Sequence, residues 1–247
     1  MRIAALYDIH GNLPALEAVL KDIEGEDVDE IVVGGDIVLG PMTRECLDIF
    51  LNFEKPVRFI RGNCESAVLD QIDGRPLPNL PESVLEDIRW TANQHASGHR
   101  EALVKFSKTV AIGFEKHGKI LFCHATPRND NENFTVITPE KDLVPVFERL
   151  NSKTVVCGHT HMQFDRKIGD TRVLNAGSVG MPFGKRGADW LLVGSEIEFR
   201  HTDYDTDAAS ERIINTSYPN AREFVDKYVL DSPSEELMRE ILSGIKP

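Results

Sequence analysis

The chain has 247 residues, of which 41% are hydrophobic and 28% charged, and its formal net charge is −12. This acidic balance, without a cluster of Lys and Arg, argues against a nucleic-acid-binding surface. No apolar run approaches the roughly 20 residues that a membrane-spanning helix needs, and the aspartate at position 8 interrupts any secretion signal, so a cytoplasmic protein without a membrane partner is expected.

The first half of the sequence alternates apolar runs with amphipathic segments. Residues 3–7, 30–35 and 56–62 are apolar runs typical of strands, and residues 13–25 and 43–53 between them follow a helical period. This order predicts a β-α-β-α-β unit whose strands form a parallel sheet covered on both faces.

The remaining segments continue this alternation and then change character. A mostly helical segment is expected over 66–108, followed by strands at 109–115 and 119–124, a helix near 139–150 and a strand at 153–158. Four short strands without helices between them follow, at 163–169, 171–177, 188–194 and 197–202. We expect these four to form a second, mostly antiparallel sheet with Trp190 in its core. The tail, 206–247, is expected to be helical, and no linker divides the chain, so a single domain over 1–247 is predicted.

Potential metal ligands follow five of the apolar runs. They are Asp8 and His10, then Asp36, Asn63, His124, and finally His159 with His161. Ligands of open α/β sheets bind outside the carboxyl ends of the strands, so these side chains are expected to converge. Taken singly, each has a structural explanation: Asp8 could cap a helix, Asp36 could be a turn residue and Asn63 could form an Asx turn.

Seven nitrogen and oxygen donors exceed what one ion usually needs. Two ions about 3.5–4 Å apart that share a bridging carboxylate would use them all, and such a pair activates a hydroxide and neutralises phosphate oxygens. Imidazole and carboxylate without thiolate suit Mn, Fe, Zn, Co or Ni. The predicted cofactors are therefore two divalent transition metal ions.

The motifs DIH, GGD, GNC, CHA and GHTH, in this order, resemble the calcineurin-like metallophosphoesterase superfamily, especially its small bacterial and archaeal phosphodiesterase-like branch. The resemblance implies an α/β fold, a four-layer α-β-β-α sandwich of two mixed sheets flanked by helices. It also implies ligand roles, in which Asp36 bridges two metals. The first metal would be held by Asp8, His10 and His161, and the second by Asn63, His124 and His159.

The activity that this resemblance implies is that of a dinuclear metal-dependent phosphoesterase, a hydrolase. It would cleave a phosphodiester or nucleotide-type phosphoanhydride in a small phosphorylated substrate, by attack of a metal-bridging hydroxide. The predicted catalytic residues are Asp36, Asn63, His124 and Cys64. Two alternatives are a phosphomonoesterase and a catalytically weak binding module, since a retromer subunit shares this fold. A nucleotide-binding regulator is disfavoured, because neither a G-x-G-x-x-G motif nor a P-loop is present.

One position departs from the best-known form of the superfamily. A histidine that protonates the leaving group often follows the asparagine there, but here Cys64 follows Asn63, and its thiol is a possible, weak acid. His95 and His99 could reach the mouth of the site from the helical segment 66–108, or be surface residues. Arg128 could bind phosphate or ribose, or be an ordinary surface residue.

The other cysteines have no C-x-x-C partner and are expected to be reduced thiols. Cys123 directly precedes His124, so its side chain should face the opposite side of the strand. Cys157 lies within an apolar run, and both are predicted to be core residues, while Cys46 carries no separate prediction.

Overall fold

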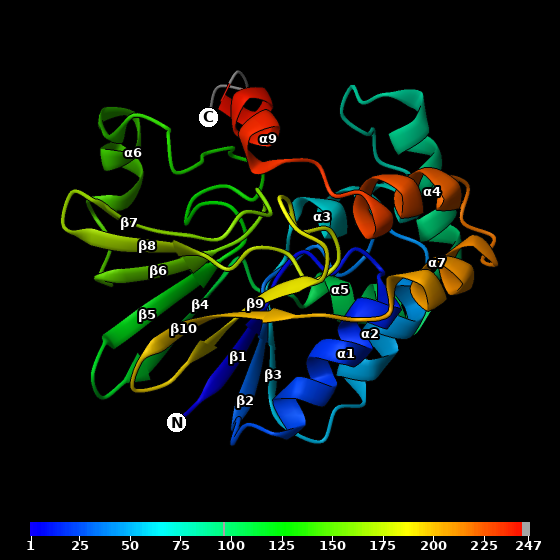
Figure 1. The fold of residues 1–247 in the computed structure, drawn as a ribbon. Helices are drawn as coiled ribbons and strands as arrows, with labels where there is room; N and C mark the ends of the chain where they lie inside the picture. Colours follow the sequence, from blue (N-terminus) through cyan, green and yellow to red (C-terminus); the bar gives the residue numbers. More distant parts are fainter. Residues whose placement is uncertain (96, 244–247) are drawn as a thin grey trace.

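Two five-stranded mixed sheets form the centre of the protein, in a computed structural model that describes residues 1–95 and 97–243 (Figure 1). The first sheet contains, in spatial order, β10 (Ile197–Thr202), β9 (Ala188–Val193), β1 (Ile3–Leu6), β2 (Glu30–Val33) and β3 (Val57–Phe59). The second contains β4 (Thr109–Phe114), β5 (Gly118–Cys123), β6 (Thr154–Cys157), β8 (Thr171–Asn175) and β7 (Phe164–Ile168). Strands β1, β2 and β3 are parallel to one another, as are β5, β6 and β8, so their carboxyl ends share an edge within each sheet.

Helices cover the outer faces of both sheets. The helices of the chain that lie before β4 are α1 (Leu13–Glu24), α2 (Thr43–Leu51), α3 (Asn63–Ile72), α4 (Glu82–Gln94) and α5 (Ser97–Val104). Those that follow are α6 (Glu140–Phe147), α7 (Thr206–Ile214), α8 (Ala221–Phe224), the π-helical turn η1 (Val225–Leu230) and α9 (Glu235–Ser243). Figure 1 shows α1 and α2 on the side of the first sheet and α6 on the far side of the second. The expected four-layer α-β-β-α sandwich is confirmed.

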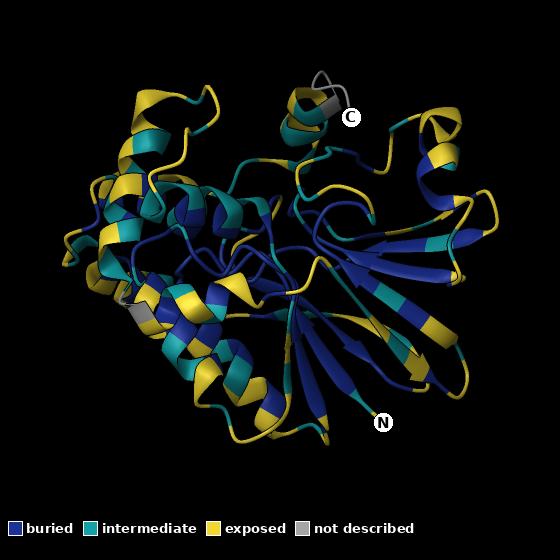
Figure 2. Cartoon of the chain, turned by 180° about the vertical axis from the view of Figure 1, so that it is seen from behind, coloured by how far each residue is buried: buried dark blue, intermediate teal, exposed yellow. Residues whose placement is uncertain are grey.

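The alternation of side chains along β1 explains how the layers are held together. Ala4 and Leu6 pack outward against the apolar faces of α1 and α2, whereas Ile3 and Ala5 pack inward against the second sheet. A third apolar cluster joins the outer face of the second sheet to α6. Strands β1, β2, β6 and β9 are therefore buried on both faces, and dark blue strands run through the middle of the molecule in Figure 2.

The prediction for the four late strands is wrong. Strands β7 and β8 extend the second sheet, but β9 and β10 cross over to the first, where β9 pairs antiparallel with β1. Strand β9 lies between β10 and β1, where every one of its residues is buried, with Trp190 facing the helices and Leu191 facing the other sheet. Such a strand needs cover on both faces, and Trp190 consequently lies in the core of the first sheet, not of the second.

The cysteine predictions agree with the structure. Cys123 and Cys157 lie in the core between the second sheet and α6, and all four cysteines are buried and free. Within residues 1–95 and 97–243, no helix has both the length and the apolar character needed to cross a bilayer.

Candidate metal centre

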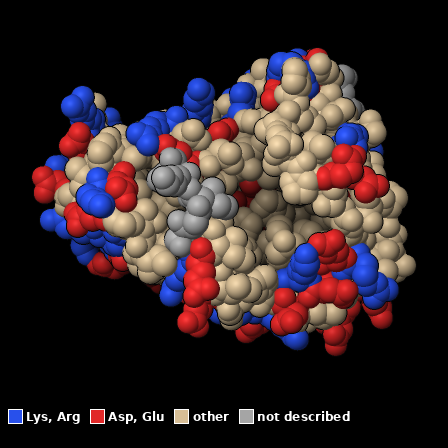
Figure 3. Space-filling model, turned by 90° about the horizontal axis from the view of Figure 1, so that it is seen from above, with Lys and Arg blue, Asp and Glu red and all other residues tan. Residues whose placement is uncertain are grey.

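The side chains predicted as metal ligands lie together where the parallel strands end. They come from the segments after β1, β2, β5 and β6 and from the first residue of α3: Asp8, His10, Asp36, Asn63, His124, His159 and His161. A hollow opens on this side of the molecule, and atoms of Asp or Glu residues, coloured red, are visible at its floor (Figure 3). Tertiary structure thus brings together donors that are dispersed over most of the sequence.

Five of these residues adopt left-handed backbone conformations. The φ angle is +53° at Asp8, +47° at His10, +53° at Asp36, +68° at His159 and +57° at His161. Non-glycine residues rarely occupy this region, and each such residue costs about 1–2 kcal/mol. Strain of this kind concentrates at functional sites, where the surrounding structure imposes a geometry on the side chains.

Two glycines allow the backbone to approach the carboxylates closely. A Cβ atom on Gly62 would lie 2.1 Å from Oδ1 of Asp36, and one on Gly158 would lie 2.4 Å from Oδ2 of Asp8. Both distances are far below van der Waals contact, so only glycine fits at these two positions. Each glycine therefore fixes the position of one acidic ligand.

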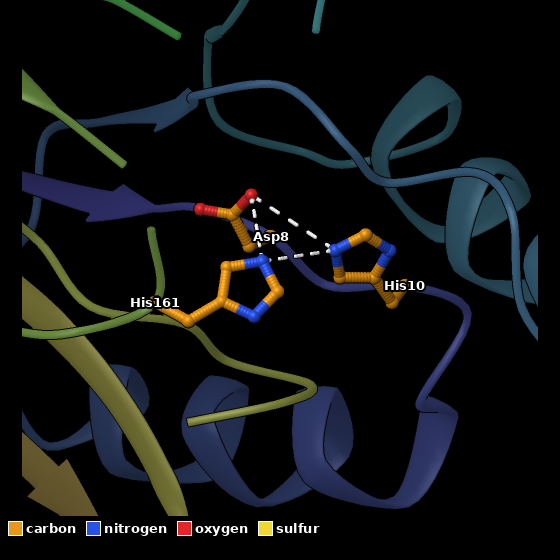
Figure 4. A group of neighbouring side chains, drawn as sticks. All are labelled: Asp8, His10 and His161. Atoms are coloured by element: carbon orange, nitrogen blue, oxygen red, sulfur yellow. Dashed lines mark hydrogen bonds and ion pairs between the residues drawn. The ribbon is translucent and has the colours of Figure 1, made fainter. Parts of the chain in front are cut away.

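The first group of donors contains Asp8, His10 and His161 (Figure 4). The Nε2 atoms of His10 and His161 are 3.2 Å apart, and Oδ1 of Asp8 lies 3.3 Å from Nε2 of His161 and 3.9 Å from Nε2 of His10. All three side chains are buried. Ligand atoms bound to a common transition metal at about 2.0–2.2 Å have such mutual separations.

The second group contains Asp36, His124 and His159, and Asn63 lies beside it. Nε2 of His124 lies 3.5 Å from Oδ2 of Asp36 and 3.0 Å from Oδ1 of Asn63. The same Oδ2 atom of Asp36 lies 3.9 Å from Nε2 of His10, which belongs to the first group. Asp36 therefore stands between the two groups.

Backbone carbonyl groups orient three of the four imidazoles. The Nδ1–H of His10 donates to the carbonyl oxygen of Leu39 at 3.4 Å. In the same way, His124 donates to Gly34 at 2.9 Å, and His161 donates to Met181 at 3.0 Å. This directs each Nε2 atom into the centre. Such orientation by a second hydrogen bond is general for metal-binding histidines.

Two buried atoms of the centre have no hydrogen-bond partner among the described residues. They are Oδ1 of Asp8 and Nε2 of His159. An unpaired buried polar atom costs roughly 1–3 kcal/mol, so native proteins rarely leave one. Divalent cations would satisfy both atoms, and the nitrogen and oxygen donor set suits a transition metal. The residues present therefore fit the expected metal centre.

Electrostatic coupling within the centre is strong. Burial alone would lower the pKa of His124, but the neighbouring charge of Asp36 raises it to about 10. Burial opposes ionisation of Asp36, yet His124 holds the pKa of that carboxyl far below its usual range. Burial, and then the charge of His124, lower the pKa of His159 to about 4. A metal that binds Nε2 of His124 would have to displace the proton that this raised pKa favours.

Cys64 lies beside Asp36, on the side of the apolar core. Its Sγ–H donates to Oδ2 of Asp36 at 3.0 Å, and its backbone N–H donates to Oδ1 at 2.9 Å. The residue is only 5% exposed and packs in the cluster between the first sheet and its helices. Burial, and then the charge of Asp36, raise the pKa of its thiol well above the ordinary value. This geometry suits a residue that orients Asp36 better than one that donates a proton to a leaving group.

Glu65 supports the loop that carries Asp36, a role that the sequence motifs did not predict. Its fully buried carboxylate accepts the backbone N–H groups of Asp36, Ile37, Val38 and Gly62, at 2.7–3.2 Å. Burial, and then the charge of Asp36, raise its pKa to about 7. A signal was present in the sequence, because a glutamate at the third position of a helix commonly accepts from backbone N–H groups at the helix start.

Among the described residues, no hydrogen bond or ion pair joins His95 or His99 to the predicted ligands. Nε2 of His95 lies 3.2 Å from the hydroxyl of Thr43, its Nδ1 lies 3.3 Å from Nδ1 of His99, and Nε2 of His99 donates to Asp48 at 2.8 Å. The pair therefore joins α2 to the segment around α5. His99 is buried, so the alternative of two surface histidines is wrong for it. Part of the segment 66–108, residue 96, lies outside the described residues.

Arg128 lies near the centre but is already paired. Its Nε and Nη2 atoms both donate to Oε1 of Glu132, at 2.8 and 2.6 Å. A carboxylate thus neutralises its charge, and the residue lines a cavity that also includes His124.

Comparisons with known proteins agree with this geometry. A model of the calcineurin-like phosphoesterase superfamily domain matches residues 1–196. An uncharacterized protein of Methanocaldococcus jannaschii is 27% identical over 244 residues, which cover 88% of this chain and 93% of the relative.

Two solved structures share the fold. A hypothetical protein of Pyrococcus horikoshii has a TM-score of 0.80 and 21% identity, with 94% of this chain and 99% of that chain covered. A metallophosphoesterase of Sphaerobacter thermophilus has a TM-score of 0.69 and 23% identity, with 92% and 97% covered. Because the family model spans most of the sequence, this chain belongs to the calcineurin-like phosphoesterase superfamily.

Proposed function

We propose that this protein is a dinuclear metal-dependent phosphoesterase that hydrolyses a phosphodiester or nucleotide-type phosphoanhydride. The observation that carries the proposal is the pair of adjoining donor groups that share Asp36, with Oδ1 of Asp8 and Nε2 of His159 unpaired inside them. Membership of the calcineurin-like superfamily supports the same reaction class.

Each donor group would hold one cation. Asp8, His10 and His161 would bind the first, and Asn63, His124 and His159 the second. When bound, two divalent cations would supply a water acidic enough to attack phosphorus near neutral pH and positive charge that offsets the phosphate oxygens. Transition metals such as Mn, Fe, Zn, Co or Ni suit these ligands, with manganese among the first to test.

The residues of the chain would position the reactants. Asp36, held by Cys64 and Glu65, would keep the two cations at a fixed separation. His124, fixed through Nδ1 by the carbonyl of Gly34, would keep its Nε2 aimed at the second cation. Placement of this kind lowers the activation barrier because little reorganisation remains when the reaction occurs.

Metal-dependent turnover of a chromogenic diester tests the proposal. Protein stripped with a chelator and reloaded separately with Mn, Co, Ni, Zn or Fe should hydrolyse bis-p-nitrophenyl phosphate, and metal analysis should find up to two ions per chain. Parallel assays with p-nitrophenyl phosphate would separate diester from monoester preference. Absence of turnover with all five metals would contradict the proposal and favour a binding module of the same fold.

A further inference from the structure

A cavity of about 270 Å³ adjoins the second donor group, with His124 in its wall. Its other walls carry three basic side chains, Arg61, Lys108 and Arg128. These three cations give the cavity a local positive charge in a chain whose net charge is −12, and such a charge attracts anions. The volume lies just below the range of pockets that enclose drug-sized ligands, and it suits a small charged group better than a whole nucleotide.

The three cations differ in how far they are neutralised. Glu132 neutralises Arg128, as described above. Among the described residues, the hydrogen-bond partners of the Arg61 guanidinium are backbone groups, with Nη2 donating to the carbonyl oxygens of Leu103 and Val104 at 3.3 and 2.6 Å. Within residues 1–95 and 97–243, neither Arg61 nor Lys108 has a carboxylate within ion-pair distance. Two positive charges at this cavity therefore lack a carboxylate partner.

Backbone pairing brings these two cations together. Ile60 and Ser107 form an isolated β-bridge, in which the backbone N–H of Arg61 donates to the carbonyl of Ser107 at 2.8 Å. In return, the N–H of Ser107 donates to the carbonyl of Phe59 at 3.1 Å. Arg61 and Lys108 directly follow the two bridged residues, so the fold fixes both at the cavity.

The remaining lining favours a charged ligand over an aromatic one. Asp130 contributes a carboxylate, which accepts the hydroxyl of Ser66 at 2.9 Å, but positive charge still exceeds negative charge around the cavity. Among the described residues that line it, none is Phe, Tyr or Trp, so no ring is available to stack on a base. The cavity is thus built for an oxyanion next to the metal centre.

We propose that this cavity binds the leaving phosphate of a phosphoanhydride substrate, with Arg61 and Lys108 as the residues that select it. This inference rests on the proposed function. In the reaction, the oxygen of water bonds to the scissile phosphorus, and the bond from that phosphorus to the bridging oxygen breaks. The electron pair stays on that oxygen, which departs as part of a phosphate, and the water protons pass to solvent or to the phosphate products.

An anhydride also matches what surrounds the cavity. A phosphate is a weakly basic leaving group and departs without prior protonation, whereas an alkoxide needs a nearby acid. Cys64 turns its thiol to Asp36, and neither it nor the His95–His99 pair is among the lining residues. Among the described residues that line the cavity, the cationic side chains of Arg61 and Lys108 are therefore what faces a departing group.

Substitution of Lys108 tests this inference with little risk to folding, because its side chain is exposed. Lys108→Met should lower kcat/KM for inorganic triphosphate about tenfold, and that for bis-p-nitrophenyl phosphate less than twofold. Lys108→Arg should restore the triphosphate value. The control is Lys119→Met, at an exposed lysine at the opposite end of β5 from His124. This substitution should leave kcat/KM unchanged for both substrates.

A binding measurement gives a second readout. Isothermal titration calorimetry of inorganic pyrophosphate into metal-depleted protein should show binding that weakens about tenfold in Lys108→Met and is unchanged in Lys119→Met. Equal effects of Lys108→Met on both substrates, or unchanged values for triphosphate and pyrophosphate, would overturn the inference even if the diester is turned over. Failure of the proposed function itself gives a different result from failure of this inference. In that case the unmodified protein would show no metal-dependent turnover of either substrate.

Discussion

The carboxylate of Glu65 lies directly behind Asp36 and accepts its backbone N–H at 2.8 Å. The same carboxylate accepts the N–H groups of Ile37 and Gly62, at 2.9 and 2.7 Å. Glu65 therefore ties the loop that carries Asp36 to the start of α3, which carries Asn63. Two predicted ligands from different strand ends are positioned by one buried side chain.

Glu65→Gln should weaken the centre without removing a ligand. The substitution keeps the size of the side chain but places an NH₂ donor against backbone N–H groups, and unpaired buried donors cost about 1–3 kcal/mol. We expect the free energy of unfolding, measured with urea, to fall by that amount. In the metal-loaded protein, kcat should fall at least tenfold, with little change in KM.

The control is Glu24→Gln, at an exposed position near the end of α1, which should behave like the unmodified protein. If Glu65→Gln kept full activity and stability, a neutral acceptor would suffice, and the carboxylate would not be what holds Asp36.

Asp36→Asn should lower the activity by several orders of magnitude and cost at least one metal. Oδ2 of Asp36 faces His124 at 3.5 Å and His10 at 3.9 Å, one from each donor group, and an amide binds divalent metals less strongly than a carboxylate. Activity toward bis-p-nitrophenyl phosphate and metal content by elemental analysis check this expectation. Retention of both metals together with a near-normal rate would contradict the bridging role.

Much of this centre could be predicted from the sequence because local patterns place it. Paired ligands two residues apart, such as Asp8 with His10, follow apolar runs typical of buried strands, and parallel strands end at a shared edge. The sheet topology was harder. An apolar strand such as β9 does not specify its partner, and its pairing with β1 joins residues from opposite ends of the chain.

The supports of the site were less predictable, because they depend on tertiary contacts. Arg61 and Lys108 are far apart in the sequence and meet only through the bridge between Ile60 and Ser107. The carbonyl groups that orient the imidazoles, such as that of Met181, belong to the backbone, so the residue type does not predict them. Glu65 was predictable in principle from its position in α3, but not its contact with the loop of Asp36.

Cys64→Ser should reduce activity far less than Asp36→Asn. The thiol donates to Oδ2 of Asp36 at 3.0 Å, and a serine hydroxyl can donate in the same way. We expect less than a tenfold loss of kcat for Cys64→Ser and a larger loss for Cys64→Ala, which removes the donor. Both are measured with bis-p-nitrophenyl phosphate, whose aryl leaving group needs little protonation, and with a diester that has an alkyl leaving group.

The comparison of leaving groups separates two roles for the thiol. If Cys64 orients Asp36, both diesters should lose activity to the same extent. A selective loss with the alkyl diester, as severe as that of Asp36→Asn, would instead make the thiol a proton donor.

His95→Gln should make the folded protein less sensitive to acid. Burial first, and then the neighbouring imidazole of His99, lower the pKa of His95 to about 4, with a smaller opposing effect of Asp48 and a reinforcing one of Arg44. The unfolded chain would titrate this group near pH 6.5. Between these values the unfolded state binds more protons than the folded state, so His95 stabilises the fold above pH 6.5 and this contribution is lost as the pH falls toward 4.

Unfolding in urea at pH 8 and pH 5 measures this effect. From pH 8 to pH 5, the free energy of unfolding should fall by about 2 kcal/mol less in His95→Gln than in the unmodified protein. All other titrating groups occur in both proteins, so their contributions largely cancel in the difference. An identical pH dependence would show that His95 titrates alike in the folded and unfolded states, and that its contacts with Thr43 and His99 do not hold it neutral.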